Sequence, residues 1–242
     1  MIAFRGLKLL ESAVALLYPP VCVVCGADVP FREQLCDSCQ GRASRIVAPF
    51  CRKCSQPFEG AMEGEFTCAN CAHRTLYFEA AVSAYRSRGV VRQIIHDFKY
   101  GRQVYLRHSI TRWLGVAMND ERISAERFDV IAPVPLHPAR QRERGFNQAS
   151  LLAELLSKQV SVPWKLLLER HRYTTTQTAL DRAERIENLR NAFRLRKNID
   201  VRRLRILLID DVLTTGATLS ECARVLKNAG ATSVYAVTAA RG

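Results

Sequence analysis

The stretch from residue 204 to residue 237 decides the fold and reads LRILLIDDVLTTGATLSECARVLKNAGATSVYAV. An apolar run at 206–209 leads directly into Asp210 and Asp211, and a Thr-Thr-Gly turn follows. Apolar residues then recur at helical spacing before a second apolar run begins near Ser233. This order predicts a buried strand, a helix and a second strand of an α/β fold, with two carboxylates at the tip of the first strand.

The acid pair and the turn after it indicate a ligand site. A strand buried on both faces does not hold unpartnered carboxylates in its core, so Asp210 and Asp211 are expected to face a ligand. Gly216 permits unusual backbone angles, and the amides of the turn, with the N-terminus of the next helix, favour an anion. Because the turn lacks lysine and the Gly-x-x-x-x-Gly-Lys spacing, it is not a P-loop for nucleoside triphosphates. A ribose 5-phosphate suits acids beside amides, whereas helix capping by Thr214 or Thr215 leaves the acid pair unexplained.

Strand and helix signals alternate from residue 79 onward. Strand signals occupy residues 79–85, 128–134, 164–168, 204–209 and 233–238. Helix signals occupy residues 90–100, 104–118, 147–158, 182–191 and 219–228. The alternation predicts a mostly parallel sheet flanked by helices. In such sheets ligands bind beyond the carboxyl ends of the strands, where both the acid pair and a basic loop at 135–146 are expected.

The charge of the chain is unevenly distributed. Its 242 residues, 48% of them hydrophobic, suffice for one large domain with a small appendage. Residues 1–80 carry 8 basic and 8 acidic side chains, whereas residues 81–242 carry 28 and 15 and so hold the whole net charge of +13. This excess favours phosphates, nucleotides or nucleic acid as ligands, with a solvated basic surface as the alternative. The apolar runs are too short to cross a bilayer, so we expect a cytoplasmic protein without transmembrane helices.

The N-terminal segment at 1–19 predicts a short amphipathic helix. One helical face carries Leu7, Leu10, Val14 and Leu17. The segment resembles a signal peptide only briefly, because Glu11 interrupts its apolar stretch and no small-residue cleavage site follows. We expect the apolar face to pack on the body of the protein, the alternative being contact with a membrane surface or a partner.

The first third of the chain is rich in cysteine. Eight of the nine cysteines form four Cys-x-x-Cys pairs: Cys22/Cys25, Cys36/Cys39, Cys51/Cys54 and Cys68/Cys71. Two such pairs complete a tetrahedron around zinc, so the set predicts two structural zinc ions in a domain at 20–76. Pairing in chain order and an interleaved order, in which the first pair joins the third, both satisfy the spacing. Four disulfides would need a secretory signal, and four regular pairs are too many for a redox-active dithiol.

Three motifs carry a family resemblance. At 209–218, IDDVLTTGAT resembles the phosphoribosyl-pyrophosphate (PRPP) motif of type I phosphoribosyltransferases. The stretches PVPLHPARQRERGFNQA at 133–149 and TTTQTALDRAERIENLRNAF at 174–193 are similar to the ComF family. Members of that family place a cysteine-rich zinc module ahead of a phosphoribosyltransferase domain. The resemblance therefore implies a type I phosphoribosyltransferase-like domain at 77–242 behind a double zinc ribbon.

The resemblance also implies roles for individual residues. Asp210 and Asp211 would contact the ribose hydroxyls around Mg²⁺, while Arg140 and Arg144 on the loop at 135–145 would meet the pyrophosphate. Guanidinium groups are independently suited to that leaving group, the alternative being a nucleic-acid backbone. The residues expected to hold the 5-phosphate are Leu213, Thr214, Thr215, Gly216, Ala217 and Thr218. Independently of the resemblance, Lys99 is expected to reach the phosphates, the alternative being an ordinary surface residue.

The implied reaction is the transfer of a phosphoribosyl group from PRPP to a nitrogen nucleophile that the sequence does not identify. The segment at 172–193 resembles a family lid, in which Arg185 would reach the substrate; an exposed basic helix is the alternative. The resemblance also points to natural transformation, so a second hypothesis is an adaptor that binds single-stranded DNA or, through its neutral zinc region, a competence protein. A third hypothesis is a PRPP sensor without catalysis.

Overall fold

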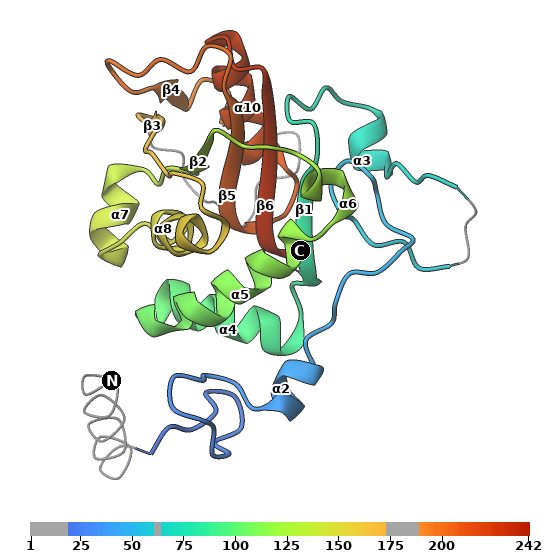
Figure 1. The fold of residues 1–242 in the computed structure, drawn as a ribbon, viewed down its shortest axis with the longest axis vertical. Helices are drawn as coiled ribbons and strands as arrows, with labels where there is room; N and C mark the ends of the chain where they lie inside the picture. Colours follow the sequence, from blue (N-terminus) through green and yellow to red (C-terminus); the bar gives the residue numbers. More distant parts are fainter. Residues whose placement is uncertain (1–18, 61–63, 173–188) are drawn as a thin grey trace.

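The computed structural model describes residues 19–60, 64–172 and 189–242, and its centre is a parallel sheet (Figure 1). The sheet has four strands in the order β1–β6–β5–β2, and each neighbouring pair is parallel. The strands are β1 (Ala81–Arg86), β2 (Val130–Pro133), β5 (Arg205–Leu213) and β6 (Ser233–Arg241). Apolar side chains are buried on both faces of these strands, as parallel sheets require. The expected parallel sheet is confirmed.

Helices cover both faces of this sheet. The long helices are α4 (Gly89–Tyr100), α5 (Arg107–Met118), α8 (Gln148–Val160) and α10 (Ala217–Asn228). The shorter ones are α2 (Asp37–Gly41), α3 (Ala69–Ala72), η1 (Val104–Leu106) and α6 (Glu121–Ser124). Because successive strand residues point to opposite faces, Leu207 and Ile209 join the core under α4, α5 and α8, whereas Ile206 and Leu208 join the core under α10. One sheet therefore organises two cores.

Two elements near the carboxyl edge of the sheet differ from expectation. β5 continues past Ile209 to Leu213, because β6 runs beside it and keeps pairing with it. The acid pair therefore lies inside a strand and not at its tip. The basic segment expected as a loop contains a helix, α7 (Pro138–Arg144), with proline in its first turn and a left-handed Gly145 (φ 86°) after its end.

The prediction of a strand at 164–168 is wrong. Trp164 makes a single bridge to Ile131 at the outer edge of β2, and the chain then leaves the sheet. The next strand, β3 (Leu168–Arg170), pairs in antiparallel fashion with β4 (Phe193–Leu195) in a separate hairpin. A residue that bridges an edge strand once does not extend the sheet.

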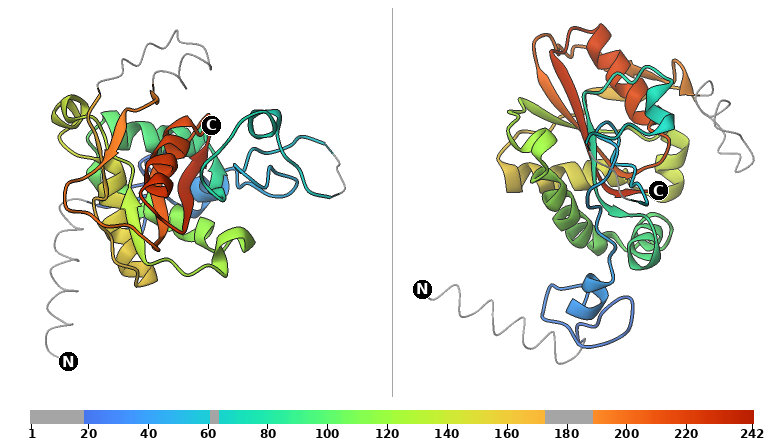
Figure 2. Two further views of the ribbon diagram at one scale, coloured as in Figure 1. Left: turned by 90° about the horizontal axis from the view of Figure 1, so that it is seen from above. Right: turned by 90° about the vertical axis from the view of Figure 1, so that its right-hand side faces the viewer.

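The two cysteine-bearing segments, one containing α2 and the other α3, lie at different places around the sheet (Figures 1 and 2). The group that contains α2 packs on α5, where Ser109 donates a 2.8 Å hydrogen bond to Gln34. The group that contains α3 lies against β1 and the start of α10. Between the groups, residues 44–46 run antiparallel to β1 and hydrogen-bond to its backbone. The cysteine-rich region thus covers one edge of the sheet.

Some expectations fall on residues that the structure does not describe. They are the N-terminal helix, except for residue 19, and most of the helix at 182–191, together with Arg185. Among the helices of the described residues, none combines the length and the apolar character needed to cross a bilayer.

Candidate active site and metal centres

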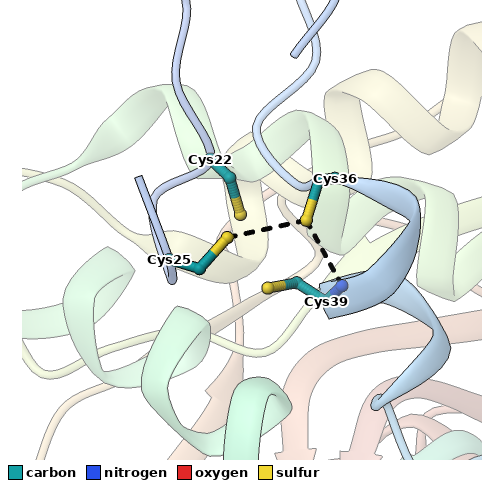
Figure 3. Close-up of side chains that lie close together, drawn as sticks. All are labelled: Cys22, Cys25, Cys36 and Cys39. Atoms are coloured by element: carbon teal, nitrogen blue, oxygen red, sulfur yellow. Dashed lines mark hydrogen bonds between the residues drawn. The ribbon is translucent and has the colours of Figure 1, made fainter. Parts of the chain in front are cut away.

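The eight paired cysteines form two compact centres. The first cysteine centre consists of Cys22, Cys25, Cys36 and Cys39, and the second of Cys51, Cys54, Cys68 and Cys71. Within each centre all sulfur atoms lie within 4.8 Å of one another. The Cys25–Cys36 and Cys54–Cys68 sulfur distances are both 3.6 Å, close to the edge of about 3.8 Å of a tetrahedron with Zn–S bonds of about 2.3 Å. Figure 3 shows the four side chains of the first centre converging. Each centre fits one zinc ion, so pairing in chain order is confirmed.

The acid pair lies where the edge strand has already ended. β2 stops at Pro133, opposite Ile209, whereas β5 and β6 continue side by side. Asp211 is only 2% exposed and lies on the face of β5 that carries α4 and α8. Asp210 is half-buried, and strand alternation turns it toward the other face. The two acids therefore have different surroundings, although their carboxyl groups interact electrostatically.

Lys99 decides the charge of this pair. Its ammonium group, in the last turn of α4, forms an ion pair with Asp211, and the Gln148 side chain lies 3.5 Å from the other Asp211 oxygen. Burial opposes ionisation, but the charge of Lys99 lowers the pKa of Asp211 below its usual range. Burial and the neighbouring Asp211 charge raise the pKa of Asp210. A cation close to both acids would favour the ionised form of each.

The threonine turn (residues 213–218) follows directly. Gly216 adopts a left-handed conformation (φ 76°) and caps α10. In the described part of the chain, the Ala217 amide donates to the Thr215 hydroxyl at 3.3 Å, while no acceptor takes the amides of Thr214, Thr215, Gly216 or Thr218. The turn thus presents backbone donors at a helix N-terminus, an arrangement that binds phosphate groups.

A basic rim stands beside the acids. Lys99, Arg140 and Arg144 line a cavity of about 430 Å³, together with Tyr100, Arg102 and Glu143. The Arg144 guanidinium lies 5.3 Å from the centre of the Tyr100 ring and donates to Gln148 at 2.6 Å. Since Lys99 both lines the cavity and pairs with Asp211, this one side chain links the basic rim to the acid pair.

Comparisons with known proteins agree with this architecture. Residues 13–75 match the double zinc ribbon domain, and residues 147–242 match the phosphoribosyl transferase domain. Competence protein F of Haemophilus influenzae is 31% identical over 86% of this chain and 91% of its own length. The chain belongs to the ComF family. Other relatives are the DNA utilization protein YhgH of Escherichia coli (30% identical, 90% of this chain and 96% of the relative) and competence protein ComFC of Bacillus subtilis (27%, 91% and 95%).

The ComF site contains residues that the sequence did not single out. Tyr100 and Gln148 orient Arg144, and Arg170, at the end of β3, interacts electrostatically with Arg140 and Asp210. Tyr100 directly follows Lys99 in the sequence, so it could have been found. Arg170 could not, because the hairpin that positions it leaves the sheet.

Metal analysis of the ComF protein should find two zinc ions per chain. Structural zinc contributes on the order of 10 kcal/mol to folding, so a strong chelator should markedly lower the thermal unfolding temperature. The matched control is Cys222→Ala, which removes the ninth cysteine, buried in α10 outside both centres. This variant should keep two ions, and a single ion in the parent protein would contradict the assignment.

Lys99→Met should destabilise the protein at neutral pH by about 3–5 kcal/mol, because it leaves the Asp211 charge buried and unpaired. In the parent, Asp211 has a lowered pKa, so its contribution to stability is complete above the pKa of unfolded aspartate and disappears as the pH falls through the folded value. The deficit of the variant should therefore shrink on acidification, as its Asp211 becomes protonated.

Denaturant unfolding at pH 7 and at acid pH measures this effect. Lys158→Met is the control, because it breaks the exposed ion pair with Glu154 and should change stability by less than about 1 kcal/mol. Equal stability of both variants at pH 7 would show that the buried ion pair carries no charge stabilisation.

Proposed function

We propose that this ComF protein binds PRPP with Mg²⁺ and transfers its phosphoribosyl group to a nitrogen nucleophile. The observation that carries the proposal is the meeting of the Asp210–Asp211 pair, the threonine turn and the basic rim at one edge of the sheet. Carboxylates suit ribose hydroxyls, backbone amides suit a phosphate monoester, and arginines suit pyrophosphate. Each part of PRPP thus has a chemically matched group.

The acid pair holds the sugar in this proposal. Asp211 keeps its charge through Lys99, while Asp210 becomes fully ionised once a cation is near. Magnesium usually binds through one or two carboxylates and the phosphates of the substrate, and when bound it stabilises the negative charge of the departing pyrophosphate. The threonine turn binds the 5-phosphate and so fixes the other end of the sugar.

The basic rim receives the leaving group. As the bond to pyrophosphate breaks, positive charge grows on the anomeric carbon and negative charge grows on the bridging oxygen. In this proposal Arg140 and Arg144 stabilise that negative charge, which is supported by their shared cavity and by the contacts of Arg144 with Tyr100 and Gln148. The nucleophile approaches the opposite face of the sugar.

Asp210→Asn combined with Asp211→Asn should weaken PRPP binding by roughly a hundredfold or more, since hydrogen bonds to charged groups contribute about 1.5–3 kcal/mol each. Calorimetry with PRPP and Mg²⁺ measures the affinity, and circular dichroism checks that the fold is retained. The control is Asp200→Asn, an exposed acid paired with Arg202, which should bind as the parent does. Unaltered affinity in the double variant would refute the site.

Pyrophosphate release separates the enzyme from a sensor. Release that depends on a defined acceptor, found by screening bases and nucleotides, establishes phosphoribosyl transfer. Mg²⁺-dependent binding without release in the presence of every acceptor identifies a PRPP sensor.

A second candidate function is the handling of single-stranded DNA in the cytoplasm during natural transformation. The names of the relatives, which include a DNA utilization protein and two competence proteins, favour it. Tyr100, 65% exposed, lines the cavity of the basic rim, and Tyr105, 49% exposed, follows five residues later in η1. Exposed aromatic rings among arginines form the stacking platform and charged groove that single strands require. The zinc region, with its neutral charge balance, would then remain available for a competence protein.

Arg140→Ala with Arg144→Ala should reduce the salt dependence of oligonucleotide binding. Each phosphate contact to a single strand contributes about 0.7 to the slope of log K against log salt, so the slope should fall by about 1.4. Fluorescence anisotropy over a salt series measures it. Arg202→Ala with Arg203→Ala is the control, because it removes the same charge before the start of β5, at the opposite edge of the sheet. Equal slopes in all three proteins would remove the basic rim from DNA binding.

A further inference from the structure

The second cysteine centre is hydrogen-bonded to the threonine turn. Asn70, in α3 between two of the zinc-ligating cysteines, donates to the Thr215 carbonyl at 3.2 Å. Arg74 donates to the same carbonyl at 3.1 Å and to the Asn70 side chain at 3.0 Å. The two donors therefore hold each other as well as the turn, and both follow the position of α3.

A buried arginine makes a second link at the start of the turn. Arg241, the last residue of β6, is only 6% exposed. Its guanidinium donates to the Leu213 carbonyl and to the Cys54 carbonyl, each at 3.2 Å, and lies 3.9 Å from the Cys54 sulfur. One side chain thus connects a ligand of the second centre to the residue before Thr214. Its charge also offsets that of a four-thiolate metal centre.

The first cysteine centre makes no such link. An arginine also stands beside it, since Arg42 donates to the Cys39 sulfur at 2.9 Å. Its neighbours on the body of the protein belong to α5, however, and within the described residues no hydrogen bond joins it to residues 213–218. The two centres have the same four-cysteine ligand set, but the first contacts α5 and the second contacts the threonine turn.

Peptide geometry turns these links into a constraint on phosphate binding. In a planar trans peptide, the carbonyl of one residue and the amide N–H of the next point in opposite directions. The Thr215 carbonyl points toward α3, so the Gly216 amide N–H points away from α3. In the same way, the Leu213 carbonyl points toward Arg241, so the Thr214 amide N–H points away from Arg241. Hydrogen bonds to a carbonyl also polarise the peptide and strengthen its N–H as a donor.

We propose that the second cysteine centre aims the Thr214 and Gly216 amides, and that Asn70, Arg74 and Arg241 are positioning residues for phosphate. The proposal rests on the proposed binding of PRPP in the threonine turn. It assigns the second zinc ion a role in ligand affinity in addition to folding, and it assigns the first zinc ion no such role.

The test compares Asn70→Ala with Arg74→Ala, as a double variant, against Arg42→Ala, which removes an arginine beside the first centre. Both proteins should keep two zinc ions. In the double variant, ¹⁵N order parameters of the Thr214 and Gly216 amides should fall from about 0.85 toward 0.6 without any ligand. Its affinity for PRPP with Mg²⁺ should fall about tenfold, as expected for the loss of two modest hydrogen bonds. Arg42→Ala should match the parent in both measurements.

A second pair of variants tests the metal itself. Cys68→Ser and Cys36→Ser should each lose one zinc ion, but only Cys68→Ser should lower the order parameters of the turn. Arg74→Lys keeps a cationic donor, so it should lose less affinity for PRPP than Arg74→Ala does.

The outcomes separate the two proposals. A parent protein that does not bind PRPP refutes the proposed function, while the order parameters still decide the present inference. Unchanged order parameters in the double variant overturn the inference, and so does unchanged PRPP affinity in that variant when the parent binds. Equal loosening of the turn in Cys36→Ser and Cys68→Ser overturns the distinction between the two zinc ions.

Discussion

The ion pair between Lys99 and Asp211 is the interaction on which the site depends. A carboxylate that is 2% exposed inside a sheet is tolerated only with a cation against it. That cation comes from the last turn of α4. The charge of the acid pair therefore depends on the packing of α4 on the sheet. Any ligand cation that approaches Asp211 also meets Lys99, whose own pKa, despite the burial that opposes its charge, is raised by the two acids. The pair thus keeps the site charged and ordered before a ligand arrives.

Local spacing was enough to predict the parts of the protein that are determined locally. The eight zinc ligands follow from the Cys-x-x-Cys spacing, although only the structure decided their pairing. The apolar runs predicted the strands of the main sheet, and the helical pattern at 147–158 predicted α8, which Asn147 caps by accepting from the Ala149 amide at 3.0 Å. Each of these features depends on residues a few positions apart, which a sequence displays directly.

The features that the sequence did not predict depend largely on contacts between segments that are far apart in the chain. β5 continues through the acids because β6 continues beside it, and the length of β6 cannot be known from β5. Pro138 and Gly145 mark the two ends of α7, but none of its side chains is buried, so the segment has no apolar periodicity to indicate a helix. The contact between Arg241 and Cys54 joins residues 187 positions apart. No local sequence pattern predicts such a contact. The fold likewise does not determine which individual residues bind a ligand.

The cysteine-rich region completes the sheet and does not merely accompany it. β1 is an edge strand, and an open edge exposes unpaired backbone groups that invite association with other chains. Residues 44–46, between the two centres, donate to and accept from that edge, with Ile46 bonded to Ala84 at 2.9 Å and Arg86 bonded to Ser44 at 2.8 Å. Each centre anchors one end of this segment, the first on α5 and the second on β1 and α10. Loss of either anchor would expose the edge of β1, so the zinc region has a structural role in the sheet of the phosphoribosyl transferase domain.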